Sequence, residues 1–224
     1  FIDKNSGKPF ALFLSTFEPH SPYSGPYNDL YDPPELPVGP AFLQQPKTAS
    51  LYHRTRASYY SKFLTEGGSR DDPYMRDYLL DPDLTLDSEL DWRILRAKYL
   101  SNITLVDDMA GMVLNALEAN GVADDTIVVF TSDHGHMVGE HGLWCMTPFY
   151  EMSAKIPLII VPAKGDQRLR AGAVDERLAD FGDLMPTLLD LAGLPIPGHV
   201  DQLSLVGEQE RSHLYGEHGE GTAA

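Results

Sequence analysis

Three consecutive residues, Asp133, His134 and Gly135, combine side-chain types that can do chemistry. A carboxylate and a neutral imidazole form half of a ligand set for manganese or zinc and, less typically, for calcium, which prefers oxygen. Successive side chains of a strand point to opposite faces, so both can reach one cation only where the backbone leaves the strand. Gly135 permits that turn. Taken alone, the motif is explained as well by an acid that caps a turn and a histidine packed at a strand end as by a pair of metal ligands.

Apolar, β-branched residues precede this motif. The run Thr126–Gly135, TIVVFTSDHG, predicts a buried strand that presents Asp133 and His134 at its carboxyl end, where open α/β sheets bind their ligands. The run Pro9–Thr16 predicts a second buried strand, and His20 follows it on a loop stiffened by two prolines. If the two strands are parallel, His20 and Asp133 meet at one edge of the sheet. Taken alone, His20 is better explained as an ordinary loop histidine.

Other periodic segments predict the elements around these residues. Residues Leu90–Asn120 place apolar side chains at three- and four-residue steps and stop at Asn120-Gly121, which predicts a long helix with a left-handed cap. The run Ile156–Val161 predicts a third strand, and Phe181–Leu194 predicts an amphipathic helix whose Met and Leu side chains enter the core. Helical spacing also occurs at Tyr52–Thr65.

The order of these elements predicts one α/β unit. The helix at 90–120 and the strand after it form half of a crossover unit, so we expect a layered α/β/α sandwich with a mostly parallel central sheet. A chain of 224 residues, 42% of them hydrophobic, is sufficient for one such core. Residues 21–90 begin with a stretch rich in Pro, Tyr and Asp, and we expect them to form a loop-rich insertion over the active face.

Charge and cysteine content exclude several functional classes. The 17 Lys and Arg against 33 Asp and Glu give a formal charge of −16, which lacks the basic surface needed for nucleic acid. We expect no membrane contact, because no apolar run has the length of a bilayer span and Phe1–Pro9 has no signal-peptide pattern. The compartment stays open. The single cysteine, Cys145, excludes an intramolecular disulfide framework.

Two other groups of acids and imidazoles are weaker candidates for chemistry. His136, Glu140 and His141 lack the His-x-x-x-His spacing of helical zinc sites, and the neighbouring glycines indicate an irregular turn. Asp107 and Asp108 project about 100° apart on the predicted helix, so they do not form an aligned carboxylate pair. A solvated or helix-bonding role is expected for both.

Several longer segments occur in a specific order: PFALFLSTFEPHSPY, then RAKYLSNITLVDDMAGMVLNALEANGVADDTIVVFTSDHG, then GEHGLW, FYEMSAKIPLIIV and DLMPTLLDLAGLP, across residues 9–195. In this order they resemble the later part of a type I sulfatase of the alkaline phosphatase superfamily. The resemblance implies an alkaline phosphatase-like fold, of which residues 1–224 form one partial catalytic domain. It also implies that Asp133 and His134 bind a divalent cation, Ca²⁺ with Mn²⁺ or Mg²⁺ as alternatives, and that His20 is catalytic, contacting the oxygens or leaving group of the substrate.

The same resemblance implies features from which this chain departs. The family's nucleophile is a formylglycine made from Cys in a Cys-x-Pro-x-Arg or Cys-x-Ala-x-Arg signature, whereas Cys145 lies in Cys-Met-Thr-Pro-Phe, after the metal pair. We therefore expect the nucleophile and further acidic ligands in an N-terminal half outside this chain, and no activity from the chain alone. Met146 stands where the family places a substrate-binding Lys, His136 where an acid is common, and Lys155 is expected to be structural.

The leading hypothesis is a sulfuric ester hydrolase that cleaves a small anionic sulfate monoester by metal-assisted covalent catalysis. A phosphodiesterase or phosphonate monoester hydrolase of the same superfamily is an alternative, because the same metal site serves phosphoryl transfer. A non-catalytic fragment or pseudoenzyme is a third hypothesis, favoured by the missing signature and by Met146. The natural substrate and the oligomeric state stay open.

Overall fold

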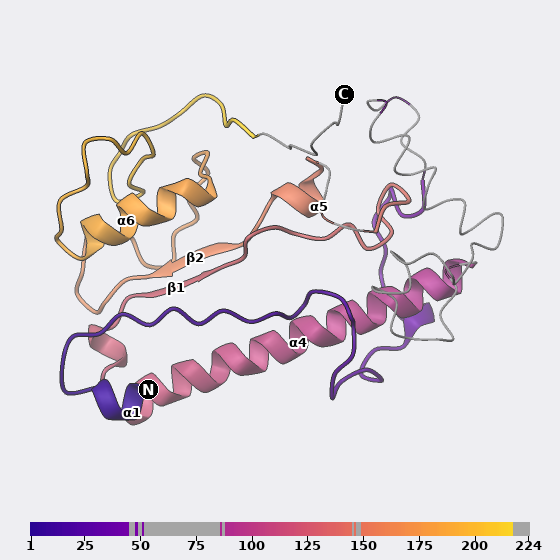
Figure 1. The fold of residues 1–224 in the computed structure, drawn as a ribbon, viewed down its shortest axis with the longest axis horizontal. Coiled ribbons are helices and arrows are strands. Elements are labelled where there is room, and N and C mark those ends of the chain that lie inside the picture. Colours follow the sequence, from indigo (N-terminus) through magenta and orange to yellow (C-terminus); the bar gives the residue numbers. More distant parts are fainter. Residues whose placement is uncertain are drawn as a thin grey trace, which may run out of the picture. The chain divides into compact units, whose positions relative to one another are not determined.

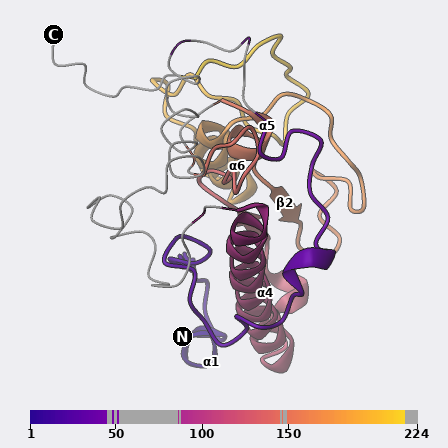
Figure 2. The same ribbon diagram turned by 90° about the vertical axis from the view of Figure 1, so that its right-hand side faces the viewer.

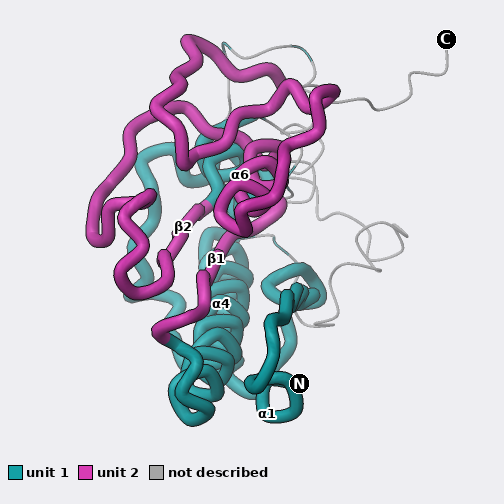
Figure 3. Tube along the Cα trace, turned by 90° about the vertical axis from the view of Figure 1, so that its left-hand side faces the viewer, with its two compact units in different colours: residues 1–123, 134–156 teal, residues 124–133, 157–224 magenta. Residues whose placement is uncertain are grey.

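The computed structural model describes residues 1–44, 48, 51, 86, 88–144, 146 and 149–216. The chain divides into two compact units (Figure 3): unit 1 is residues 1–123 and 134–156, and unit 2 is residues 124–133 and 157–224. The helix predicted at Tyr52–Thr65 and the single cysteine, Cys145, lie outside the described residues, as does most of the 45–87 part of the expected insertion.

Helix α4, Glu89–Ala119, is the longest element of unit 1 and confirms the helix predicted at Leu90–Asn120 (Figures 1 and 2). A capping box fixes its start: Asp91 N–H donates to Ser88 Oγ at 3.2 Å, and Ser88 N–H donates to Asp91 Oδ2 at 3.1 Å. These two bonds satisfy amides that lack partners inside the helix. At the other end Gly121 adopts a φ of 67°, in agreement with the predicted left-handed cap.

The core of unit 1 is built on the first turns of α4. Its buried cluster consists of Tyr23, Leu86, Trp92, Leu95, Met137, Val138, Leu143 and Trp144. The predicted apolar stripe is correct for Leu95 and Leu117, but Ile103 is 40% exposed, and the polar side chain of Asn102 is buried instead. Among the described residues no helix, α4 included, is apolar over the length that a membrane span requires.

Short elements join the N-terminal residues to α4. Helix α1, Ile2–Asn5, contacts the end of α4, where the Asn120 amide donates to Asp3 Oδ1 at 2.8 Å. The 3-10 turn Pro33–Glu35 contacts the start of α4, where Arg93 donates to the Leu36 carbonyl at 2.8 Å. The described part of the predicted loop region therefore contacts α4 through a short 3-10 turn.

The apolar segment Pro9–Thr16 is not the buried strand that we predicted. It is extended (Figure 1) but belongs to no sheet, and Phe13 and Leu14 are 84% and 60% exposed. A strand needs a neighbouring strand to bond its backbone, and the described residues of unit 1 contain none. The segment is apolar and extended, as predicted, but the prediction that it is buried is wrong.

Unit 2 contains a two-stranded sheet formed by β1, Val128–Thr131, and β2, Leu158–Val161. Both strands lie within the runs predicted at Thr126–Gly135 and Ile156–Val161. They pair antiparallel, with Val128 opposite Val161. The mostly parallel sheet that we expected is therefore not found in the described residues, because apolar runs predict strands without indicating their direction.

The strands of unit 2 are also less buried than predicted. Phe130 of β1 is 39% exposed, and Ile159 and Val161 of β2 are 55% and 50% exposed. Among the described residues between the two strands in sequence, the short helix α5, Glu151–Ala154, belongs to unit 1. The apolar side chains of this sheet thus keep a large accessible surface in the described chain.

The predicted helix at Phe181–Leu194 is confirmed as a 3-10 turn, Phe181–Asp183, that runs into α6, Leu184–Leu191. The expectation that its Met side chain enters the core is wrong, because Met185 is 46% exposed. The polar residues Asp183 and Thr187 are buried instead.

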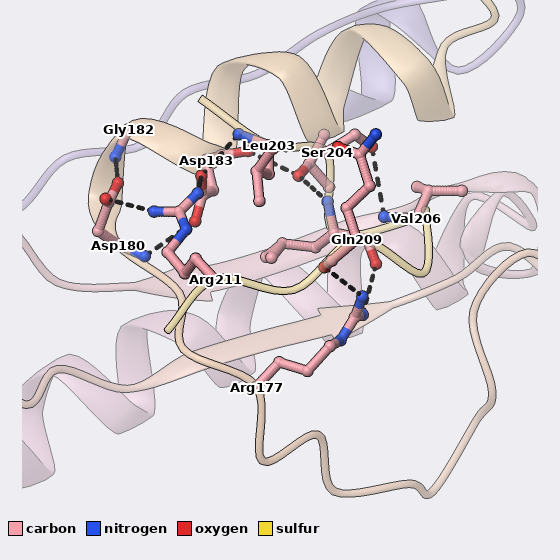
Figure 4. Close-up of polar contacts among 11 residues, drawn as sticks. Arg177, Asp180, Gly182, Asp183, Leu203, Ser204, Val206, Gln209 and Arg211 are labelled. Carbon is pink, nitrogen blue, oxygen red and sulfur yellow. Dashed lines mark hydrogen bonds and ion pairs between the residues drawn. The ribbon is translucent and has the colours of Figure 1, made fainter. Parts of the chain in front are cut away.

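An ion-pair network explains the burial of Asp183 (Figure 4). Arg211 donates to Asp183 at 2.5 Å and to Asp180 at 2.7 Å, and the Asp183 side chain has no exposed surface. The same carboxylate accepts from the backbone N–H of Leu203 at 2.9 Å. The buried charge is therefore paired and hydrogen-bonded, as a carboxylate in a protein interior must be.

Two further arginines hold the loops of unit 2 in a repeated geometry. Arg168 and Arg177 each bind the aspartate two residues earlier, Asp166 and Asp175, at 2.6 Å. The remaining guanidinium N–H groups donate to backbone carbonyls: those of Asp190 and Leu191 for Arg168, and those of Leu205, Gly207 and Gln209 for Arg177. The planar guanidinium thus joins a local carboxylate to a distant loop.

Candidate functional site

The structure places His20 and His134 in unit 1 and Asp133 in unit 2. Strand β1 ends at Thr131, so the backbone has left the strand before the Asp133-His134 motif begins. Asp133 is exposed and His134 is half-buried. The backbone at Asp133 and His134 is therefore outside the strand.

Hydrogen bonds to backbone carbonyls define the tautomers of both predicted histidines. His134 Nδ1 lies 2.9 Å from the Gly135 carbonyl oxygen, and His20 Nδ1 lies 2.5 Å from the Ser21 carbonyl oxygen. A carbonyl oxygen only accepts, so Nδ1 carries the proton of each neutral ring and Nε2 carries the lone pair. This is the arrangement found in histidines that bind a metal or accept a proton through Nε2.

Close packing against α5 makes Gly135 necessary. Its N–H donates to the Ser153 carbonyl at 2.7 Å, and a Cβ atom at this position would overlap the carbonyl oxygen of Met152. Any side chain at 135 would therefore displace α5 or the loop that carries His134. The sequence suggested glycine for a turn, whereas the structure requires it for this approach.

His20 lies in a tight turn of the loop 17–22. Its N–H donates to the Phe17 carbonyl at 3.1 Å, and its ring lies 4.8 Å from the Phe17 ring, centre to centre. The peptide bonds before Pro19 and Pro22 are both cis. The loop therefore presents His20 on a short, internally bonded turn.

A third imidazole, that of His136, follows His134 by two residues. His136 is buried, and its Nε2 lies 2.8 Å from the hydroxyl oxygen of Tyr23, which accepts from the Trp144 indole N–H at 2.9 Å. The pKa of His136 is lowered from 6.5 to about 3, chiefly by burial and further by the charges of protonated His134 and His20. The ring of His136 is therefore neutral at pH 7.

Sequence reasoning gave no role to Tyr23 or Trp144. Both lie in segments that were recognised for other reasons, PHSPY and GEHGLW, but an aromatic residue in a loop has no distinctive spacing. Their burial, with exposed fractions of 7% and 0%, is the signal that distinguishes them, and it appears only in the structure.

The residues of the weaker zinc hypothesis have other contacts. Glu140 is buried, accepts from the Gly39 N–H at 3.1 Å and lies 4.0 Å from the Arg96 guanidinium. His141 stacks on the Tyr150 ring at 4.2 Å. Across the described ranges of the chain, no group of three or more His, Cys, Asp or Glu is arranged to hold a metal ion.

Met146 stands where the resemblance predicts a substrate-binding Lys, and Lys155 follows it nine residues later. Met146 packs against the core of unit 1, and its carbonyl accepts from Ser153 Oγ at 2.5 Å. The Lys155 side chain is 79% exposed and pairs with Glu151 at 3.6 Å on the surface of α5.

Comparison with known proteins gives consistent similarities. The family model described as Sulfatase matches residues 1–194. The chain is 33% identical over 214 residues to the multifunctional alkaline phosphatase superfamily protein PehA of Trinickia caryophylli, covering 92% of this chain and 38% of that protein. It is 29% identical over 226 residues to an arylsulfatase of Clostridium perfringens, covering 97% and 42%.

Among solved structures, the phosphonate monoester hydrolase SpPMH from Silicibacter pomeroyi is similar, with a TM-score of 0.62 and 35% identity. The similarity covers 84% of this chain and 34% of that one. This chain therefore has a partial α/β fold like that of the hydrolase, and it spans about two fifths of the length of the curated relatives described above.

Proposed function

Because this chain belongs to the sulfatase family, we propose that the complete protein is a sulfuric ester hydrolase acting on a small anionic sulfate monoester. The observation that carries the proposal is the Asp133-His134 pair, which is separated from the end of β1 by one residue, with His134 Nδ1 bonded to the Gly135 carbonyl. This pair supplies a carboxylate and an imidazole whose lone pair is on Nε2, and both are suitable ligands for a divalent cation.

The proposed cation is Ca²⁺, with Mn²⁺ or Mg²⁺ as alternatives, held by Asp133, by Nε2 of His134 and by further acidic ligands from outside this chain. When bound, it would neutralise negative charge on the ester oxygens. His20 is proposed to contact those oxygens or the leaving group. Its neutral ring accepts a hydrogen bond at Nε2, and its protonated ring donates one there, which suits a leaving oxygen.

We further propose that residues 1–224 are one part of a single catalytic domain, with 21–90 as a loop-rich insertion over the active face. The nucleophile, a formylglycine, would lie in an N-terminal half. Two observations support this: the chain covers 38% and 42% of the two curated relatives, and Phe13 and Ile159 in strand-like segments are 84% and 55% exposed. The isolated chain should therefore be inactive.

A phosphonate monoester hydrolase is the second candidate. The 35% identity and TM-score of 0.62 to SpPMH favour it. Met146 does not distinguish the two candidates, because a sulfate monoester and a phosphonate monoester each carry one negative charge and a thioether neutralises neither.

The test uses the complete protein with p-nitrophenyl sulfate and p-nitrophenyl phenylphosphonate, before and after EDTA and after return of Ca²⁺, Mn²⁺ or Mg²⁺. We expect the sulfate ester to react faster and EDTA to abolish both activities. Asp133→Asn should lower kcat and bound metal by at least about 100-fold. The control Asp125→Asn makes the same charge change at an exposed position of unit 2 and should change neither.

Each part of the proposal has a result that contradicts it. Faster cleavage of the phosphonate would favour the second candidate. Equal rates with and without EDTA would contradict the metal site, and a complete protein inactive on both esters would favour a non-catalytic role.

A further inference from the structure

Three buried side chains of unit 1 form a continuous hydrogen-bonded chain, Trp144 to Tyr23 to His136. The indole N–H only donates, so the Tyr23 oxygen accepts from Trp144 at 2.9 Å. The phenolic proton is then directed to His136 Nε2 at 2.8 Å, which makes Nε2 the acceptor in this bond. Each of the three side chains is at least nine-tenths buried, so water does not compete for these bonds.

This chain of bonds links two loops that are far apart in sequence. Tyr23 lies three residues after His20, and His136 lies two residues after His134, while 113 positions separate Tyr23 from His136. Several other bonds of the first loop are local, such as His20 N–H to the Phe17 carbonyl and Ser24 N–H to the Pro22 carbonyl. Those local bonds shape the loop but do not fix its distance from His134.

Aromatic packing around Tyr23 also holds the hydrogen bond between Tyr23 and His136 in place. The Tyr23 ring meets the rings of Tyr99, His136 and Trp144 edge-on, with centroid separations of 5.8, 5.8 and 6.5 Å. Tyr99, from α4, also packs on His136 at 5.4 Å. The hydroxyl of Tyr23 is therefore held in one orientation by aromatic neighbours on several sides.

We propose that Tyr23 and His136 are positioning residues that set the distance between His20 and His134, with Trp144 orienting the Tyr23 hydroxyl. This inference rests on the proposed function for its catalytic meaning. A neutral imidazole suits position 136, because it accepts from the phenol without placing a charge in the core, whereas a carboxylate there would need a buried cation.

Activity tests the positioning role through four variants of the complete protein. Tyr23→Phe keeps the ring but removes the hydroxyl, and His136→Leu removes the acceptor; both should lower kcat/KM by roughly 10- to 100-fold, because small misplacement of reacting groups is costly. His136→Gln keeps an acceptor near the Nε2 position and should stay within about fivefold of wild type. The control Tyr31→Phe removes a phenol that bonds Thr104 Oγ1 at 2.7 Å and should leave kcat/KM unchanged.

A second readout needs neither substrate nor metal. In the complete protein after removal of metal, the imidazole Hε1 proton resonances of His20 and His134 should both shift in Tyr23→Phe and in His136→Leu. They should stay in place in Tyr31→Phe and stay close to wild type in His136→Gln. Circular dichroism on the same samples identifies any variant that fails to fold. If His136→Leu fails to fold, the result for Tyr23→Phe decides whether the positioning role holds.

The results separate this inference from the proposed function. Unmoved resonances together with unchanged kcat/KM in Tyr23→Phe would overturn the positioning role, and so would a His136→Gln variant as impaired as His136→Leu. If the wild-type complete protein hydrolyses neither ester, the proposed function fails, and the resonance shifts alone still decide whether Tyr23 and His136 couple the two loops.

Discussion

Replacing Arg211 by Leu should destabilise unit 2 strongly. Leucine retains much of the apolar volume but removes the cation that pairs with the fully buried Asp183 carboxylate at 2.5 Å. Removing one partner of a buried ion pair costs about 3–5 kcal/mol, because the remaining charge stays in a medium of low polarity.

Two details of the network place the expected loss at the lower end of this range. Asp183 keeps two backbone donors, the N–H groups of Leu203 at 2.9 Å and Asp180 at 3.0 Å. The Asp180 side chain is 31% exposed, so water screens its own pairing with Arg211. We therefore expect a loss of about 3 kcal/mol, which is roughly a 150-fold change in the unfolding equilibrium.

Hydrogen exchange measured by mass spectrometry on the 224-residue chain is the suitable assay. Tryptophan fluorescence cannot report on unit 2, because Trp92 and Trp144 are the two tryptophans of the chain and both belong to unit 1. In Arg211→Leu, peptides covering 180–191 and 203–211 should exchange up to roughly 150-fold faster, while α4 keeps its protection.

Arg170→Leu is the matched control, because it makes the same charge change at an exposed position of unit 2. It should alter the stability of unit 2 by less than about 0.5 kcal/mol. If exchange in Arg211→Leu is no faster than in Arg170→Leu, the argument that Asp183 depends on its buried ion pair is refuted.

Three further predictions concern unit 1. Because the pKa of His136 falls from 6.5 in the unfolded chain to about 3 in the folded one, chiefly through burial, only the unfolded chain binds this proton between these values. The free energy of unfolding should therefore decrease as the pH falls from 6.5 towards 3, by at most about 1.4 kcal/mol per pH unit from this group. Urea titrations at pH 7 and 4.5, followed by tryptophan fluorescence, should show a weaker pH dependence in His136→Gln; an equal dependence would contradict the assignment. Ser88→Ala removes the capping side chain of α4 and should cost about 1 kcal/mol in the same assay at pH 7, and no change would show that the cap is dispensable. Gly135→Ala should lower the thermal midpoint because its Cβ overlaps the Met152 carbonyl oxygen, whereas Gly111→Ala, in open space on α4, should raise the stability by about 0.5–1 kcal/mol; midpoints in the opposite order would refute the packing argument.

Elements specified by local patterns were predictable from the sequence. The observed bounds of α4 differ from the predicted 90–120 by only one residue at each end. The prediction is this close because Ser88 before the helix and Gly121 after it are local signals. Strands β1 and β2 lie inside the predicted apolar runs for the same reason.

Properties that depend on distant partners were not predictable. The apolar run Pro9–Thr16 has the composition of a buried strand, but burial depends on a neighbouring strand, which the described residues of unit 1 do not include. On α6 the hydrophobic pattern favoured Met185 as core, yet Asp183 is buried because Arg211, 28 residues later, neutralises it. Periodicity contains no information about such a partner.

The candidate site shows the same division. Residue type and the following glycine singled out Asp133 and His134, and two prolines singled out His20. The contact between Tyr23 and His136 spans 113 positions, so the link between the two histidine loops emerged only from the structure.

The ion pairs of Arg168, Arg177 and Arg211 affect how unit 2 responds to different denaturants. Free guanidinium ion carries the same planar donors as these side chains, so in concentrated solution it competes directly for their carboxylates and carbonyl oxygens, and its chloride salt also screens the ion pairs. Urea is uncharged and lacks this screening. Unit 2 should therefore lose a larger share of its stability than unit 1 when urea is exchanged for guanidinium chloride, and the order in which the two units unfold can differ between the two solvents.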